Sequence, residues 1–247
     1  MKADPFAQLK LLDVQELDSR IDQLRHQLAS LPEHEQISAL QATRGTLVDR
    51  ERDARILVDD LIREQKKADA DVEQVKARRE RDRTRMDQGL VTNPKDLERM
   101  THELATLERR IGDLEDVEID VMERLEEAEG ALAATTEELG RTDELLAATT
   151  RTRDERATEI NESLGSVQAE RATAVQGLPE DLMGLYDKLR ASKQGVAAAA
   201  LRARQCGGCR LTLNPSDLAV IAKAPVDEVV RCEECSRILV RTAESGL

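Results

Sequence analysis

The chain has 247 residues, 35% of them charged, and its only aromatic residues are Phe6 and Tyr186. Aromatic side chains supply much of the buried area of ordinary cores, so this composition argues against one large globular domain and is typical of long helices and coiled coils. The formal net charge of −13 at pH 7 disfavours binding of the molecule as a whole to nucleic acid or to an anionic membrane surface.

The sequence also lacks the usual marks of export or membrane insertion. No apolar run approaches the roughly 18 residues that a membrane span requires, and residues 1–5 lack the apolar stretch of a secretory signal. Arginine outnumbers lysine and alanine is abundant, which indicates a GC-rich bacterial genome. We therefore expect a cytoplasmic bacterial protein that has no membrane partner.

Apolar residues recur at alternating intervals of three and four in three successive segments. The first, residues 14–31, ends before Pro32, which is incompatible with a continuing helix. The second covers residues 37–75, and the third covers residues 97–139 and continues less regularly to 167. A period of 3.5 residues sustained over many heptads predicts a left-handed coiled coil.

Residues 87–94 separate the second and third segments and carry the signals of a chain reversal. Gly89 permits a sharp turn, and Asn93-Pro94 is a favourable start for a helix. The sequence therefore predicts a long antiparallel coiled-coil helical hairpin over residues 1–176, with its apex near 87–94.

The apolar pattern also suggests how the two arms are aligned. One alignment places Val58 opposite Val121 and Leu47 opposite Leu132, and a shift of about two residues below Pro32 places residue 14 opposite residue 167. We take this register as the expectation.

The pattern changes after the third segment. Gly177-Leu178-Pro179 should end the long helix. Residues 179–190 predict a short amphipathic helix within a connecting segment, 177–195. The remainder, 196–247, is predicted to be a small C-terminal β domain whose first strand covers residues 196–203.

The four cysteines of the chain form two Cys-x-x-Cys pairs, Cys206 with Cys209 and Cys232 with Cys235. Each pair can offer two thiolates to one ion, and a zinc ion prefers four tetrahedral ligands. The longer than usual spacing between the pairs is explained by an inserted helix at residues 215–223, and residues 226–231 and 237–241 are predicted strands. This arrangement predicts a zinc ribbon.

Ligand number decides the role of the metal. Four thiolates leave no open position on zinc, so the site should be structural, with one Zn²⁺ ion and no chemistry at the metal. The alternative, a redox-active dithiol pair, lacks the βαβ setting that usually accompanies one. The sequence contains no nucleophile-and-base set, phosphate loop or dinucleotide fingerprint, so we expect no enzymatic activity.

Three stretches resemble a known family. Residues 91–98 (VTNPKDLE) at the apex, 181–186 (DLMGLY) before the ribbon and 230–239 (VRCEECSRIL) around the second cysteine pair are similar to bacterial four-cysteine zinc-ribbon proteins with an N-terminal coiled-coil hairpin. Ser236 departs from the glycine expected there. The resemblance implies a zinc-binding adaptor without enzymatic activity, and it links some relatives to transcription or protein-export machinery and to RNA.

A basic run precedes the apex within an otherwise acidic chain. It could contact nucleic acid or an acidic protein surface, but a solvated helix face with internal ion pairs is the favoured interpretation, because no aromatic residue is nearby to stack on bases. The carboxylates of residues 113–144 are likewise interpreted as a solvated face. The run consists of Lys76, Arg78, Arg79, Arg81, Arg83 and Arg85.

The preferred function is a non-enzymatic adaptor that presents the hairpin tip and the zinc ribbon to protein partners. The predicted contacts are the loop Asn93, Pro94 and Lys95 and the helix at 179–190, together with the basic run. The alternative is RNA or DNA binding through the basic tip or the ribbon, in transcriptional or post-transcriptional regulation. Apolar residues outside the seam leave monomer and dimer open; they are Leu11, Leu12, Leu57, Ile62, Val117, Ile119 and Leu145.

Overall fold

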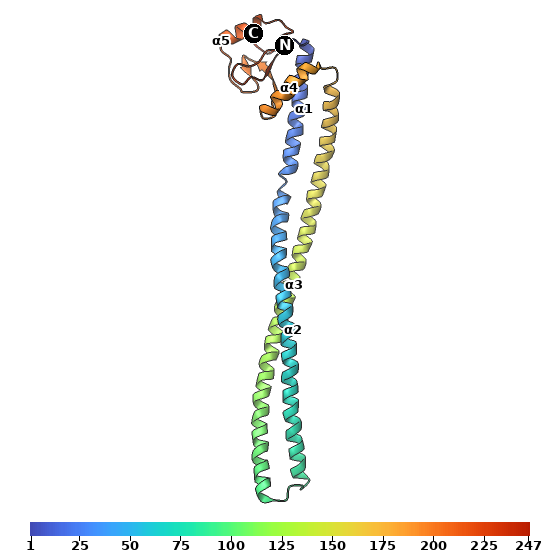
Figure 1. Cartoon of the computed structure of the whole chain (residues 1–247), viewed down its shortest axis with the longest axis vertical. Helices are drawn as coiled ribbons and strands as arrows, with labels where there is room; N and C mark the ends of the chain where they lie inside the picture. The colour runs from blue at the N-terminus through green and yellow to red at the C-terminus, as the bar shows by residue number, and fades with distance from the viewer. The chain divides into compact units, whose positions relative to one another are not determined.

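The computed structural model describes residues 1–247 and is mostly α-helical, as predicted (Figure 1). An antiparallel coiled-coil hairpin is followed by a small β ribbon, and no helix combines the length and apolar character that a bilayer crossing would require. The helices are α1 (Pro5–Ala29), α2 (Pro32–Asp87), α3 (Pro94–Ala174), α4 (Glu180–Ser192) and α5 (Pro215–Lys223), and the strands are β1 (Ala198–Arg202), β2 (Gln205–Cys206) and β3 (Ile238–Arg241).

Proline and capping residues determine where the helices begin. Each of the first three helices starts at a proline, whose missing N–H costs nothing in the first turn. The Asp4 carboxylate caps α1 by accepting a hydrogen bond from the Phe6 N–H at 2.8 Å. The Asn93 side chain does the same for the Lys95 N–H at 3.1 Å. The predicted break at Pro32 and the predicted apex at 87–94 are therefore confirmed.

The chain divides into two compact units. We call Met1–His34 with Arg151–Leu247 the ribbon unit, and Glu35–Thr150 the tip unit. The predicted division into a hairpin, a connecting helix and a ribbon stays a prediction. The compact units follow spatial contacts instead and place α1 in the same unit as the ribbon.

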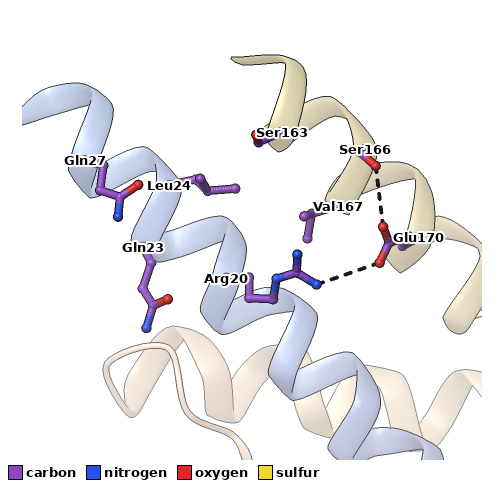
Figure 2. Close-up of a pocket in the computed structure, with 8 residues that line it drawn as sticks. All are labelled: Arg20, Gln23, Leu24, Gln27, Ser163, Ser166, Val167 and Glu170. Atoms are coloured by element: carbon purple, nitrogen blue, oxygen red, sulfur yellow. Dashed lines mark hydrogen bonds and ion pairs between the residues drawn. The ribbon is translucent and has the colours of Figure 1, made fainter. Parts of the chain in front are cut away.

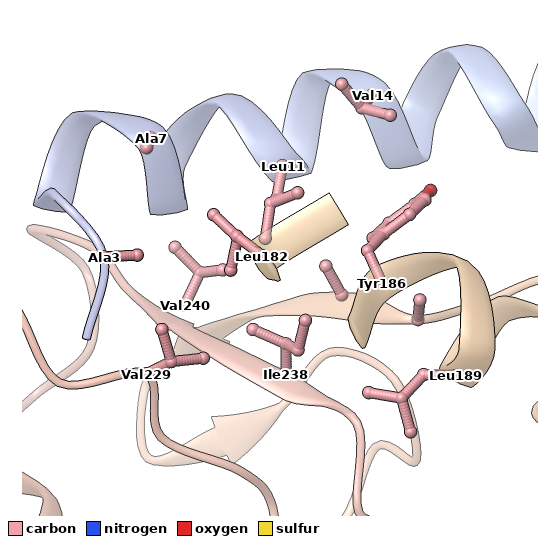
Figure 3. Packing of buried hydrophobic residues seen from close by; sticks show 12 residues of the cluster. Ala3, Ala7, Leu11, Val14, Leu182, Tyr186, Leu189, Val229, Ile238 and Val240 are labelled. Atoms are coloured by element: carbon pink, nitrogen blue, oxygen red, sulfur yellow. The ribbon is translucent and has the colours of Figure 1, made fainter. Parts of the chain in front are cut away.

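The ribbon unit has a core to which helices and sheet both contribute (Figure 3). Leu11 and Val14 of α1 and Leu182 and Tyr186 of α4 have no exposed surface, and they pack on the fully buried Ile238 of β3. Burying a side chain of this size stabilises a fold by about 1.5–3 kcal/mol. The ribbon is therefore packed directly on α1 and α4 and is not merely tethered to them.

The sheet order is β2-β1-β3, with β1 antiparallel to β2 and parallel to β3. The strands predicted at residues 196–203 and 237–241 are confirmed as β1 and β3. The strand predicted at 226–231 is wrong, because this segment forms only isolated bridges. Its first half bonds to the N-terminal segment, where Val229 N–H donates to the Met1 carbonyl at 3.0 Å. Its second half bonds to β3, so no single partner runs along it.

The tip unit is held by a narrow apolar seam between α2 and α3. Val58 and Leu61 of α2 share a buried cluster with Leu125 and Ala128 of α3. The predicted register, with Val58 opposite Val121, is therefore wrong by about one heptad. A shift of seven residues superimposes one seam position on the next, so the apolar pattern fits both alignments equally well.

Candidate metal centre

The fold brings all four cysteines together. Their sulfur atoms lie within 4.8 Å of one another, with Cys206 Sγ 3.8 Å from Cys235 Sγ and Cys209 Sγ 3.9 Å from Cys232 Sγ. Zinc–thiolate bonds of about 2.3 Å in a tetrahedron place sulfur atoms about 3.8 Å apart. The donor set and its spacing thus fit one zinc ion held by four thiolates.

Two knuckles of matching geometry position the thiolates. In the first, the Arg210 N–H donates to the Cys206 carbonyl at 2.7 Å, and in the second, the Ser236 N–H donates to the Cys232 carbonyl at 2.8 Å. Arg210 and Ser236 have φ of +62° and +63°, the left-handed region that favours glycine. This conformation explains why a glycine was expected at position 236.

The first knuckle fits closely against its surroundings. A Cβ on Gly208 would lie 2.8 Å from Cδ of Arg237 and 3.2 Å from Cβ of Ala199. The Arg237 guanidinium continues past the knuckle and donates to the carbonyls of Val196 at 2.8 Å and Lys193 at 3.1 Å. Arg237 therefore ties the metal centre to the segment that joins α4 to β1, a role that the sequence did not indicate.

The thiols differ in acidity. Burial raises the pKa of Cys206, and burial raises the pKa of Cys232 to about 12. Burial also acts to raise the pKa of Cys235, but hydrogen bonds, first from the Arg237 backbone, outweigh it and lower that pKa to about 7. Zinc binds thiolates, so a bound cation would favour the deprotonated form of each buried thiol.

The metal centre has its own small core on the other side of the sheet. Cys206 and Cys232 are buried with Leu201 and Leu239 and with Ile221 of α5. The loop that follows α5 is held in place by Arg241, whose guanidinium donates to several carbonyl groups of that loop. The acceptors are Ala224 at 2.9 Å, Pro225 at 2.7 Å, Val226 at 3.1 Å and Glu228 at 2.9 Å.

A buried polar network in the ribbon unit was missed by sequence reasoning. The Asp18 carboxylate is 2% exposed. It accepts hydrogen bonds from Nε of Arg171 at 2.6 Å and from the hydroxyl of Tyr186 at 2.8 Å. Arg190 Nε lies 3.5 Å away without hydrogen-bond geometry, while its Nη2 bonds Asp22 at 2.6 Å. The only signals in the sequence were a carboxylate beside the apolar seam and the single tyrosine.

This network joins three helices through charge. Its members come from α1, α3 and α4, so the end of α3 is fixed against both other helices. Burial, reinforced by the hydrogen bond to Asp18, raises the pKa of Tyr186 above its ordinary value of 10.0. The same carboxylate raises the pKa of Arg171. Asp18 is therefore a charged hub whose partners both hold their protons more tightly than usual.

Gln15 is the second polar residue that was missed. Its amide oxygen accepts from the N–H groups of Ala197 at 2.7 Å and Ala198 at 3.2 Å, and its amide nitrogen donates to the Gly195 carbonyl at 2.8 Å. The side chain thereby satisfies backbone groups at the start of β1 that have no strand partner. α1 is thus bonded to the ribbon as well as packed on it.

The predicted basic run lies on α2 in the tip unit, and most of its charges are paired. Lys76 Nζ lies 2.7 Å from Glu115, Arg79 Nη1 lies 2.7 Å from Glu108, and Arg78 pairs with Glu103. Arg78 also reaches Asp82 at 3.8 Å and Arg83 reaches Asp87 at 4.0 Å, whereas Arg81 and Arg85 form no ion pair. This is the solvated, ion-paired face that the sequence favoured.

The other predicted contact residues lie in two different settings. Asn93 caps α3, whereas Pro94 and Lys95 are exposed beside it. The helix predicted at 179–190 is α4, whose apolar residues are buried in the ribbon-unit core. That apolar face is therefore unavailable to a partner.

A groove between α1 and α3 lies in the ribbon unit outside the metal centre. Figure 2 shows Leu24 and Val167 pointing toward each other across it, with Arg20 and Glu170 paired at 3.9 Å. Its remaining lining side chains are glutamines and serines. The Ser166 hydroxyl donates a hydrogen bond to Glu170 at 3.4 Å within the groove (Figure 2).

An antiparallel coiled-coil hairpin whose chain continues into a four-cysteine ribbon defines a class of zinc-binding helical proteins. Residues 14–194 match the CT398-like coiled coil hairpin domain, and residues 205–239 match the C4-type zinc ribbon domain. The chain belongs to the CT398-like coiled-coil hairpin family, and its metal centre is a C4 site for one structural zinc ion. Neither matched domain defines an enzyme family.

Relatives with this architecture occur in several bacteria. The chain is 34% identical to protein Rv2229c of Mycobacterium tuberculosis over 98% of both chains. A solved structure from Mycobacterium smegmatis has a TM-score of 0.82 and 31% identity, and the match covers 98% of this chain and 100% of that one. CT398 of Chlamydia trachomatis has a TM-score of 0.67 and 22% identity over 96% and 98% of the two chains, which shows the fold alone.

Proposed function

We propose that this protein is a non-enzymatic adaptor that presents its hairpin tip and its zinc ribbon to different protein partners. The observation that carries the proposal is the exposed apolar surface at the tip. Leu90 is 66% exposed and Leu97 is 41% exposed, next to the exposed Pro94 and Lys95. Isolated exposed apolar residues are common, but two of them beside an ordered turn form a small contact surface.

The ribbon supplies the second surface. Leu211, beside the first knuckle, is 50% exposed, and Val220 on α5 is 68% exposed. The core beneath them is fixed by the metal centre, so a partner would meet a rigid surface that loses little entropy on binding. The thiolate-rich site suits a reducing compartment, and we place the protein in the cytoplasm.

The test compares two surface variants of the full chain. Leu90→Ser with Lys95→Glu alters the tip, and Leu211→Ser with Val220→Ser alters the ribbon without touching a cysteine. Proximity labelling in the native cell should show that each variant loses a different set of neighbours. Identical losses from both variants, or no loss from either, would contradict the adaptor proposal.

Nucleic-acid binding is the weaker alternative, because the ion pairs leave few free cations on the basic run. The adaptor proposal expects no saturable binding of single-stranded RNA or duplex DNA at low salt. Binding that disappears in Arg81→Glu with Arg85→Glu would favour the alternative, since these two arginines form no ion pair and no fold contact should be lost.

A further inference from the structure

A second stripe of residues runs along α3 beside the buried seam. Val121, Leu125 and Ala128 form the seam and are buried. The residue after each of them lies about 100° further round the helix, on its exposed side. Ile119 precedes these three residues on the same side of the helix, and Ala133 follows them. The five positions are separated by alternating steps of three and four residues, the spacing of a helix-packing surface. They are Ile119, Met122, Glu126, Glu129 and Ala133.

The stripe contains an apolar groove. Ile119 is 53% exposed and Met122 is 48% exposed, so two large apolar side chains one helical turn apart lie at the surface. The groove has a volume of about 320 Å³, with buried Leu125 among its lining residues and Gln65 contributed by α2. Apolar side chains could therefore be added here without rearrangement of the seam.

Three carboxylates line the same groove, and none of them has a cationic partner. Glu123, Glu126 and Glu129 lie beside the apolar residues. Arg124 is the adjacent cation, but it pairs with Glu64 at 3.4 Å and Asp120 at 3.7 Å. In contrast, Glu103, Glu108 and Glu115, which are nearer the tip, pair with the basic run. The groove is thus apolar at its centre, and its edge carries negative charges that no cation of the protein pairs with.

We propose that this groove binds a basic amphipathic helix of a protein partner. Apolar side chains of that helix would cover Ile119 and Met122, and its lysines or arginines would pair with the three glutamates. The small Ala133 at the end of the stripe allows the two helices to approach closely. The surface would thus become a local three-helix bundle with α2 and α3.

Charge also excludes the competing occupants. The acidic edge repels nucleic acid and anionic lipid. A second copy of this chain would bring an identical acidic stripe against the first, and such like-charge contacts are unfavourable. The inference does not depend on whether the tip or the ribbon binds a partner.

The probe is a designed, fluorescently labelled helical peptide of about 18 residues, long enough to form a helix in contact with the groove. It carries leucines at a three-and-four spacing flanked by arginines and lysines. One twin replaces the basic residues by glutamate, and a second twin replaces the leucines by serine. Fluorescence anisotropy with the full-length, zinc-loaded protein should show saturable binding of the basic leucine peptide only.

Matched variants locate the binding site. Ile119→Ser with Met122→Ser, and separately Glu123→Gln with Glu126→Gln and Glu129→Gln, should each weaken binding by about tenfold or more. The apolar control is Leu145→Ser, a 55% exposed leucine of the same helix. The charge control removes three unpaired carboxylates elsewhere on α3 with Glu155→Gln, Glu159→Gln and Glu162→Gln. Both controls should leave affinity within about twofold.

Three results would overturn the proposal. Equal binding of the basic and acidic twins would show that charge plays no part. An equal loss of affinity in the charge control would show that net charge alone attracts the peptide. A dimer in analytical ultracentrifugation that becomes a monomer in Ile119→Ser with Met122→Ser would show that a second copy occupies the groove.

Discussion

The ribbon unit and the tip unit achieve stability in different ways. In the ribbon unit, single residues have individual partners: Asp18 is bonded by two side chains from two other helices, and Gln15 bonds the start of β1. In the tip unit, successive heptads repeat the same apolar seam, and the ion pairs lie at the surface. A unit built from unique contacts should therefore lose its fold after one substitution, whereas a repetitive unit should tolerate many single changes.

The largest effect is expected at the metal centre. Cys232→Ser removes a zinc ligand that is 1% exposed, and structural zinc contributes about 10 kcal/mol or more to folding in small zinc domains. We expect bound zinc to fall from one ion per chain to none and the ribbon to become protease-sensitive. Elemental analysis and limited proteolysis measure both effects.

The tip unit should remain helical in that variant, as it should after chelation of zinc from the unaltered protein. Circular dichroism at 222 nm tests this separation. The exposed Leu211→Ser is the control and should retain zinc. A collapse of most helicity in Cys232→Ser would show that the seam of the tip unit depends on the ribbon.

The next effect concerns the buried carboxylate. Asp18→Ala removes the hydrogen-bonded counter-charge of Arg171 and the acceptor of the Tyr186 hydroxyl, which should lower the free energy of unfolding of the ribbon unit by about 3–5 kcal/mol. Asp22→Ala is the control, because the Asp22 side chain is 43% exposed and should cost about 1 kcal/mol or less. The free energy of unfolding of the ribbon unit is measured in urea, with protease cleavage of this unit as the signal. Equal costs for the two substitutions would contradict a stabilising role for the buried network.

Tyr186 should make the ribbon unit sensitive to alkaline pH. Its pKa is higher in the folded protein than its ordinary value of 10.0, so folding favours the protonated phenol. This contribution is fully present below pH 10 and is lost as pH rises above it. Tyr186→Phe removes the hydrogen bond to Asp18 and should cost about 1.5–3 kcal/mol at pH 8.

The contribution of the Tyr186 proton to stability is tested by comparing the unaltered protein with Tyr186→Phe at increasing pH. The free energies of unfolding of the unaltered protein and of Tyr186→Phe should converge as the pH rises above 10. The unaltered protein then loses the stabilisation from the protonated hydroxyl, which the variant lacks at every pH. A constant difference across this range would show that the hydroxyl makes no proton-linked contribution.

The smallest effect is expected in the tip unit. Arg44 Nε lies 2.6 Å from Asp143, a distance equal to that between Arg171 and Asp18, but its side chain is 47% exposed. Arg44→Ala should therefore cost about 1 kcal/mol or less, and the cost should shrink as salt increases. Thermal denaturation at two salt concentrations provides the measurement, and a cost similar to that of Asp18→Ala would remove the distinction between the units.

Local signals in the sequence were sufficient for the ends of the long helices and for the zinc ligands. Pro32, Asn93 and Pro94 act through their own backbone chemistry, so they mark helix ends wherever they occur. Two Cys-x-x-Cys pairs combine into four zinc ligands with little need for the rest of the chain. These features could be predicted because each depends on a few adjacent residues.

Features that depend on distant residues could not be predicted. The register failed because a heptad shift restores the same apolar contacts, so Val58 could be placed against either of two neighbouring seam positions. The false strand at 226–231 failed because its partners include residues at the N-terminus. The structural roles of Asp18 and Gln15 were missed because both residues form hydrogen bonds with partners more than 150 positions away in the sequence.

The pairing of the N-terminal segment with the end of the ribbon has a consequence for synthesis. Ala3 donates to the Asp227 carbonyl at 2.7 Å, and α1 packs on α4 and β3. The ribosome makes α1 first, at about 5–20 residues per second, so its apolar face waits on the order of ten seconds or more for these partners. During that interval the apolar face of α1 lacks both α4 and β3 as partners within its own chain, because these two elements begin more than 150 positions after α1 ends.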